Sequence, residues 1–298
     1  MYRGETAMRT LLGLISCFFL LAGCSFISVD EKDIETDEQI TTSEPSTQVT
    51  DSSLINVVED FFIFEWYTAK ELEAKPVFYL ALGDSLTKGV GDETNNYGFT
   101  GLLAQELNKW PAISEVELDN RGKNGRRSDQ LLTLVEDGQY DKELSKADLI
   151  TITLGGNDVM KVVKEDLFNL DVEMFEEAMP PFLERYEQIV EYIRTKTNAP
   201  IILVGFYNPF TIITDEYTPF ETIIEDWNRE IEVITKKTKN ACFAHIEDLF
   251  TSNVDMVYHT DFFHPNAKGY ERMAERVKQS LSNCNIEEMS DGLIGFEE

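Results

Sequence analysis

Short apolar runs alternate with amphipathic stretches along the chain from Pro76 onward. Five of these runs are rich in strand-forming residues, and we expect strands at residues 77–82, 116–119, 149–154, 201–206 and 242–246. Apolar positions at helical spacing predict helices near residues 97–109, 128–134, 172–196, 220–237 and 267–281. Continuously apolar strands that alternate with helices predict an α/β fold, a three-layer α/β/α sandwich around a central, mostly parallel five-stranded sheet.

The amino-terminal residues have a different pattern. Arg3 and Arg9 precede an apolar stretch, residues 11–22, that is too short to span a bilayer comfortably and is typical of a signal peptide. The stretch ends in Leu-Ala-Gly-Cys-Ser, which resembles the lipobox of bacterial lipoproteins. We therefore expect a lipoprotein signal peptide over residues 1–23 and a lipidated Cys24 at the mature amino terminus. The alternative is an ordinary secretory signal with an incidental cysteine.

A lipidated Cys24 would anchor the protein to the outer face of the cell membrane, outside the cytoplasm, or leave it to be released as a secreted form. Residues 24–54 are polar and acidic, with too few apolar groups to offset the entropy of ordering, and we expect a disordered tether. Residues 55–75 are too apolar for a linker and are expected to extend the folded domain. That domain is placed at residues 76–284, followed by an acidic tail over residues 285–298.

The charge balance excludes one class of partner. The chain has 26 Lys and Arg against 55 Asp and Glu, a formal net charge of -29, whereas nucleic-acid binding needs a basic surface. Solubility and adaptation to a salt-rich habitat both remain open as reasons for the acidity. The four cysteines form no C-x-x-C pair, which argues against a zinc site. A disulfide between Cys242 and Cys284 is left open by the sequence.

The first predicted strand ends at Gly83-Asp84-Ser85-Leu86, at the edge of the sheet where α/β enzymes place their chemistry. The stretch is not a phosphate-binding P-loop, because Lys88 comes before the next glycine. It is not a G-x-S-x-G nucleophile elbow either, because Thr87 stands in the place of the final glycine. Ser85 is a candidate nucleophile, and the alternative is a plain turn after a strand.

Three later stretches carry groups that a nucleophilic serine needs. Asn157 follows the third predicted strand and offers an amide donor for a developing oxyanion. Residues 120–125, after the second strand, contain two glycines whose backbone can approach a ligand closely. His264 has Asp261 three residues earlier, close enough to orient its ring. A metal site made by this pair and His259 finds no other supporting ligand cluster, so no metal is expected.

Taken in this order, the four stretches resemble the blocks of the SGNH (GDSL) hydrolase superfamily over about residues 76–282, and within it the secreted or lipoprotein enzymes of Gram-positive bacteria. The resemblance implies that Ser85 is the nucleophile, with Asp261 and His264 as the acid and base. It also implies an oxyanion hole made by the backbone N–H groups of Ser85 and Gly125 and the side chain of Asn157. The fold that the resemblance implies is flavodoxin-like.

The resemblance implies a serine esterase or lipase that hydrolyses acyl esters or lysophospholipid-type lipids through an acyl-enzyme, without a cofactor. A carbohydrate or cell-wall O-acetylesterase is the first alternative, and a non-catalytic, surface-anchored binding lipoprotein is the second. Gly122 competes with Gly125 for the donor role. Tyr207, Phe210 and Tyr217 are candidates for the wall of a substrate pocket. The expected partners are an ester substrate and the membrane, and we expect a monomer.

Overall fold

The computed structural model describes residues 74–165, 170–212, 219–251 and 257–296. The predicted signal peptide, Cys24, the tether, Tyr217 and nearly all of the 55–75 extension lie outside these residues. Within the described part, none of the helices combines the length and the apolar character that crossing a membrane requires.

A five-stranded sheet forms the middle layer, in the order β2-β1-β3-β4-β5. Every pair of neighbouring strands is parallel. The strands are β1 (Lys75–Gly83), β2 (Ile113–Gly122), β3 (Leu149–Thr153), β4 (Ile201–Val204) and β5 (Ala241–Ala244). This arrangement confirms the predicted parallel sheet and places the carboxyl ends of all five strands at one edge.

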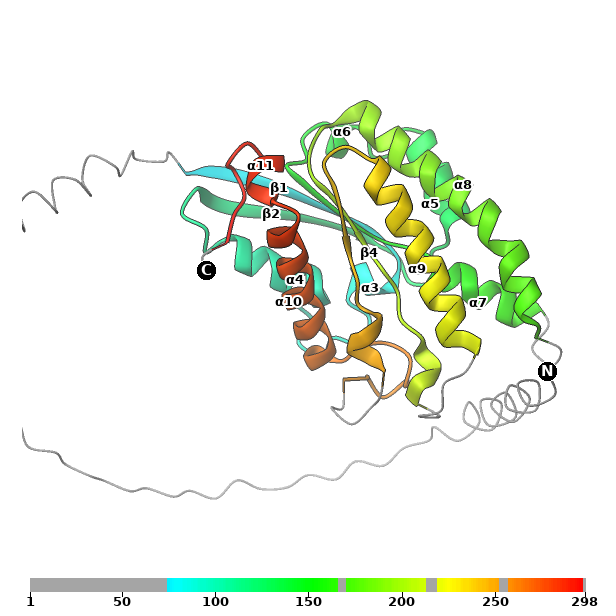
Figure 1. The fold of residues 1–298 in the computed structure, drawn as a ribbon. Coiled ribbons are helices and arrows are strands. Elements are labelled where there is room, and N and C mark those ends of the chain that lie inside the picture. Colours follow the sequence, from blue (N-terminus) through cyan, green and yellow to red (C-terminus); the bar gives the residue numbers. More distant parts are fainter. Residues whose placement is uncertain (1–73, 166–169, 213–218, 252–256, 297–298) are drawn as a thin grey trace, which may run out of the picture. The chain divides into compact units, whose positions relative to one another are not determined.

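Helices cover both faces of the sheet, which confirms the three-layer architecture (Figure 1). One face carries α4 (Gly98–Leu107), α10 (Ala267–Asn283) and α11 (Ile286–Met289). The other face carries α5 (Ser128–Glu136), α6 (Asp141–Leu144), α7 (Gly156–Glu165), α8 (Val172–Lys196) and α9 (Pro219–Lys237). Three short helices complete the described part: α3 (Ser85–Lys88), η1 (Pro209–Ile212) and η2 (Glu247–Phe250).

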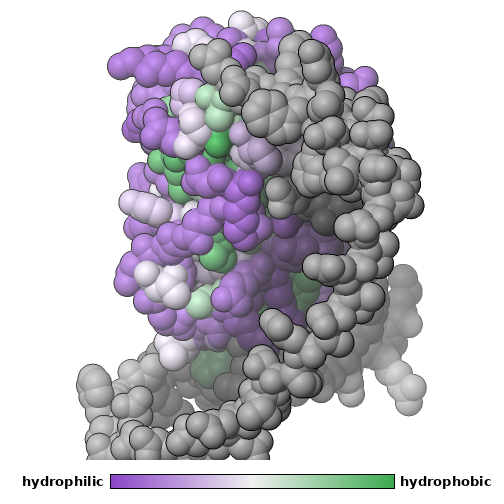
Figure 2. All heavy atoms as spheres, turned by 90° about the vertical axis from the view of Figure 1, so that its left-hand side faces the viewer, coloured by the Kyte–Doolittle hydropathy of each residue, from purple (hydrophilic) through white to green (hydrophobic). Residues whose placement is uncertain are grey.

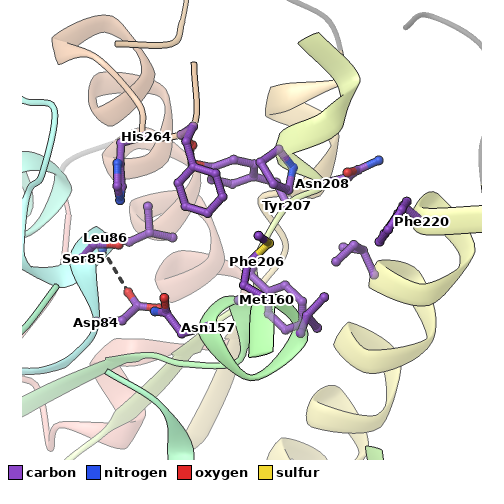
Figure 3. Close-up of a pocket in the computed structure, with 15 residues that line it drawn as sticks. Asp84, Ser85, Leu86, Asn157, Met160, Phe206, Tyr207, Asn208, Phe220 and His264 are labelled. Carbon is purple, nitrogen blue, oxygen red and sulfur yellow. Dashed lines mark hydrogen bonds between the residues drawn. The ribbon is translucent and has the colours of Figure 1, made fainter. Parts of the chain in front are cut away.

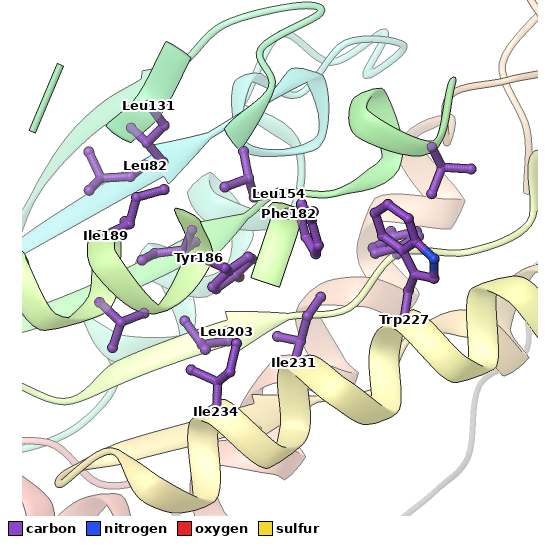
Figure 4. Close-up of a cluster of buried hydrophobic side chains, with 14 of the residues drawn as sticks. Leu82, Leu131, Leu154, Phe182, Tyr186, Ile189, Leu203, Trp227, Ile231 and Ile234 are labelled. Atoms are coloured by element: carbon purple, nitrogen blue, oxygen red, sulfur yellow. The ribbon is translucent and has the colours of Figure 1, made fainter. Parts of the chain in front are cut away.

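Side chains of β1 alternate between two hydrophobic cores, one on each face of the sheet. Leu80 and Leu82 pack in the core beneath α5, α8 and α9 (Figure 4), while Tyr79 and Ala81 pack in the core beneath α4 and α10. Since both faces are buried, a two-residue alternation of apolar and polar positions is absent and the strand is apolar throughout. Seen from the side of α4 and α10, hydrophilic side chains dominate the described surface and apolar ones are scattered (Figure 2).

Two elements differ from the expectations. The edge strand β2 is longer than the predicted 116–119, because the exposed polar residues Ser114, Glu115 and Arg121 interrupt the apolar signal on either side. The helix α7, which includes Asn157 in its first turn, is not among the expected helices. Val159, Val162 and Val163 are the buried positions of that helix, at a spacing that fits one helical face.

The predicted boundary at residue 284 also differs from the packing. Ile286 and Ile294 are 2% and 0% exposed and belong to the core beneath α4 and α10. The domain therefore continues at least to Ile294, because these two apolar side chains anchor a segment whose other residues are mostly polar or acidic. A disulfide joins Cys242 and Cys284, with 6.0 Å between their Cα atoms, and fastens the end of α10 to β5.

Candidate active site

Ser85 is the first residue of α3, directly beyond the carboxyl end of β1. The strand ends in Gly83, whose φ of +141° is a conformation that other residues rarely adopt. A Cβ at this position would also collide with the backbone oxygen and Oγ1 of Thr153. The turn into α3 therefore requires glycine, and it presents Ser85 at the sheet edge.

The side chain of Asp84 fixes this turn. Its Oδ1 accepts a hydrogen bond from the N–H of Leu86 at 2.9 Å and another from Thr153 Oγ1 at 2.7 Å. Asp84 is only 4% exposed. Burial raises the pKa of Asp84 to about 6, and the hydrogen bonds from Thr153 and Leu86 offset part of this shift. The residue before the candidate nucleophile is thus held by contacts from β3 and α3.

Asp261 accepts three hydrogen bonds, two of them from His264. Asp261 Oδ2 lies 2.6 Å from His264 Nδ1, and Oδ1 accepts from the backbone N–H groups of Phe263 at 3.0 Å and His264 at 2.9 Å. Burial alone would raise the pKa of Asp261, but the bonds from the His264 ring and the two N–H groups outweigh it and lower that pKa. With its proton on Nδ1, the neutral ring presents Nε2 as an acceptor.

Ser85, Asn157 and His264 line one pocket. In Figure 3 the His264 ring lies above Ser85 and points toward it. Nε2 of His264 is buried and finds no hydrogen-bond partner among the described residues. A buried acceptor without a partner is costly, so this nitrogen is poised to take a proton from a group that enters or turns within the pocket.

The candidate oxyanion donors come from two loops. Asn157 Nδ2 donates to the carbonyl of Arg126 at 3.1 Å, so one amide hydrogen is engaged and the other is left over. Gly125 has a φ of +77°, and a Cβ built there would meet nothing within 4 Å. Gly122 instead donates its N–H to Asn120 Oδ1 at 3.0 Å, which removes it as a competing donor. Gly125 is not among the residues that line the pocket.

Of the other residues that the sequence suggested for the site, one lines the pocket and one does not. Tyr207 lines the pocket as predicted, and its hydroxyl donates to the carbonyl of Phe263 at 2.7 Å. The side chain of Phe210 lies outside the described residues. His259 does not line the pocket, and its Nδ1 is 3.8 Å from Asp261 Oδ1.

The pocket continues away from Ser85 into an apolar region. Its wall there comes from α7, the loop after β4 and α9 (Figure 3). The residues are Val159, Met160, Phe206, Pro209, Phe220 and Ile224. Such a lining favours hydrocarbon over a hydrated group.

Sequence reasoning missed two residues that hold the loops of the site together. Arg126 is 6% exposed, and its guanidinium donates to the carbonyls of Gly83 at 3.2 Å and Arg121 at 2.6 Å. Asn120 Nδ2 donates to the carbonyl of Thr87 at 2.5 Å. No local signal could reveal these contacts, because the partners Gly83 and Thr87 are 43 and 33 residues away in sequence.

A serine, a carboxylate-oriented histidine and an asparagine around one pocket, at the carboxyl edge of a parallel sheet, define the class as an ester hydrolase of three-layer α/β/α architecture. The chain belongs to the GDSL-like lipase/acylhydrolase family, which it matches over residues 81–272. That match begins within β1, so it includes Ser85 and extends past His264 into α10.

Three similar proteins share most of the described domain. YpmR, an uncharacterised protein of Bacillus subtilis, is 39% identical over 67% of this chain and 80% of its own length. The spore germination lipase LipC of Bacillus licheniformis is 29% identical over 67% of this chain and 94% of its own length. The crystal structure of the lipase Lip_vut3 from a goat rumen metagenome has a TM-score of 0.59 and 25% identity, covering 68% of this chain and 97% of that one.

Proposed function

We propose that this protein is a serine esterase that cleaves carboxylic esters with Ser85 as nucleophile, His264 as general base and Asp261 as the orienting acid. The observation that carries the proposal is that Ser85 shares a pocket with the unpartnered Nε2 of His264, whose Nδ1 is bonded to Asp261. In this proposal, the N–H groups of Ser85 and Gly125 and the amide of Asn157 form the oxyanion hole.

The reaction follows from these roles. His264 Nε2 takes the proton of Ser85 Oγ as that oxygen attacks the ester carbonyl, and the negative charge forms on the carbonyl oxygen. The lowered pKa of Asp261 keeps it ionised, so it stabilises the imidazolium. His264 then gives the proton to the departing alkoxide, which leaves as the alcohol. Water repeats the sequence on the acyl-enzyme and releases the carboxylic acid.

The proposed substrate is an ester of an aliphatic acyl chain rather than an acetate. An acetyl group would leave the apolar region around Met160 and Phe220 unfilled, whereas each buried methylene of a longer chain gains about 0.8 kcal/mol. The similarity to a Bacillus lipase supports an acyl ester as well.

The nucleophile is tested with Ser85→Ala. We expect hydrolysis of short-chain aryl esters to fall by a factor on the order of 10⁴ or more, and labelling by a fluorophosphonate probe to disappear. Ser282→Ala, which removes an exposed hydroxyl on α10, is the matched control and should keep both ester hydrolysis and labelling by the probe. Activity retained by Ser85→Ala would refute the assignment, and an unlabelled wild-type protein would favour the non-catalytic binding protein.

The acyl chain is tested with p-nitrophenyl esters of two to twelve carbons. Met160→Trp places a larger side chain in the apolar region, so we expect kcat/KM for the octanoate to fall about tenfold or more and that for the acetate to change little. A wild-type preference for acetate, with equal effects of Met160→Trp on both esters, would contradict the acyl assignment and favour an O-acetylesterase.

We further propose that the mature protein is anchored outside the cytoplasm through a lipidated Cys24. The disulfide between Cys242 and Cys284 supports an oxidising compartment. Cys24→Ala should move the protein from the membrane fraction and the detergent phase of a phase-separation assay to the soluble fraction. Unchanged partitioning would refute the anchor.

A further inference from the structure

The outer oxyanion donors lie in the loop after β2 and in the first turn of α7, which follow two strands that are not neighbours in the sheet. Gly125 follows β2 and Asn157 follows β3, and these strands flank β1 on opposite sides. No ladder of backbone hydrogen bonds therefore joins the two segments directly, and the sheet connects them only through β1. Since an oxyanion hole works only when its donors are preorganised around one oxygen, a further set of contacts must help to fix the distance between the two donors.

Side chains make a direct bridge between the loops. Asn157 donates to the carbonyl of Arg126, one residue beyond Gly125, at 3.1 Å. The next residue, Asp158, accepts from the N–H of Ser128 at 3.0 Å and from Ser128 Oγ at 2.6 Å. Three donor groups thus join the first turn of α7, at residues 157–158, to residues 126–128 at the start of α5.

Arg185, from the middle of α8, completes the bridge. Its Nε donates to Ser128 Oγ at 2.7 Å, and one of its terminal nitrogens lies 3.5 Å from Asp158 Oδ1. The Ser128 hydroxyl therefore accepts from Arg185 and donates to Asp158, and every group has a partner of the right kind. The Asp158 side chain is 6% exposed, so water has little access to replace a lost partner.

None of the three bridging residues lines the pocket. They touch neither Ser85 nor His264 in any contact described for them, so they cannot take part in proton transfer. Apart from the electrostatic effect of Asp158 on Asp84, their connection to the site is through the two segments that they join, which carry the oxyanion donors.

We propose that Asp158, Ser128 and Arg185 are positioning residues that hold the donors of Gly125 and Asn157 at a fixed separation. The proposal rests on the oxyanion roles given above under the proposed function. Loss of the bridge lets the two loops move apart, so the charge that develops in the transition state is stabilised less while the neutral ester still binds. The expected signature is a lower kcat with an unchanged KM.

The experiment compares Arg185→Met and Ser128→Ala in the full-length protein. Arg185→Met keeps most of the apolar stem and removes all donors, and its partly exposed site makes loss of folding a smaller concern. For each variant, kcat is divided by the fraction of protein that a fluorophosphonate labels at its endpoint, so unfolded material does not count. We expect kcat to fall about tenfold, with KM within twofold of the wild type.

Two further variants separate positioning from stability. Asp148→Asn alters a half-buried carboxylate that accepts from the N–H of Phe78 at 2.8 Å. Asp148 directly precedes β3, at the amino ends of the strands and away from the site, so the kcat corrected for the labelled fraction should be unchanged. Asn157→Ala removes the donor itself, so adding Ser128→Ala to it should cost much less than Ser128→Ala alone.

A fall in unfolding temperature with a corrected kcat within twofold of the wild type would overturn the proposal. Full additivity of Ser128→Ala and Asn157→Ala would overturn it too. Failure of the proposed function is distinguishable, because Ser85→Ala would then keep its activity or the wild type would not be labelled.

Discussion

Burial and hydrogen bonding have opposite effects on the pKa of Asp84, the residue before Ser85, and their balance can be measured through the pH dependence of stability. Burial raises the pKa of Asp84 from 3.8 to about 6, although Thr153 and Leu86 both donate to its Oδ1. The folded protein therefore binds this proton more tightly than the unfolded chain does. A difference of about two pKa units corresponds to about 3 kcal/mol of stability.

The sign follows from proton binding. Between these two pKa values the folded state holds more protons than the unfolded state, so the contribution of Asp84 to stability decreases as the pH rises. It is fully present below about pH 4 and is lost as the pH passes through about 6. At neutral pH the folded protein carries this cost as a buried carboxylate.

Asp84→Asn removes the titration and keeps an oxygen that can accept both hydrogen bonds. We expect the free energy of unfolding of Asp84→Asn, relative to wild type, to rise by about 3 kcal/mol between pH 4 and pH 7. Urea denaturation at constant ionic strength measures it, with Asp137→Asn on the exposed end of α5 as the control. Parallel curves for Asp84→Asn and wild type would refute the reasoning, and a difference of the opposite sign would mean that the hydrogen bonds outweigh burial.

Two other changes test the site and its scaffold. Asp261→Asn should lower kcat by about 10³–10⁴ at pH 7, because the amide neither fixes the Nδ1 proton nor stabilises the imidazolium, and a loss below tenfold in ester hydrolysis would contradict its role. Replacing both Cys242 and Cys284 by Ala should lower the free energy of unfolding by about 4 kcal/mol, since the bridge closes a loop with a sequence separation of 42 residues. Urea denaturation of oxidised protein and the double variant measures this, and a change below about 1 kcal/mol would contradict it.

The sequence predicted those parts of the molecule that depend on local pattern. The buried strands were identified because β1 and β4 are apolar at nearly every position and β3 combines apolar residues only with threonine, as a two-sided core requires. The predicted length of the edge strand β2 was too short because Ser114, Glu115 and Arg121 are exposed polar residues. The segment after residue 284 was interpreted as a tail because its composition is acidic, although Ile286 and Ile294 are buried in the core and Met289, Leu293 and Phe296 pack against it.

The residues of the site also divide into those that a local motif indicates and those that depend on distant partners. Ser85, Asn157 and His264 were named from short motifs, and the structure brings them to one pocket. Arg126 and Asp158 were not named as supporting residues, because what they do depends on partners in other elements. Asp158 contacts Ser128, 30 residues earlier, and the sequence around a charged residue in the first turn of a helix does not indicate such a contact.

The order of the site residues along the chain limits when the enzyme can become active. Ser85 follows the first strand of the described domain, whereas His264 comes only after the last strand and just before α10. With the roles proposed above, the nucleophile is synthesised long before the base that activates it. A nascent or truncated chain that ends before His264 would then carry Ser85 with no group to remove its proton, so ester hydrolysis would begin only when almost the whole domain has been made.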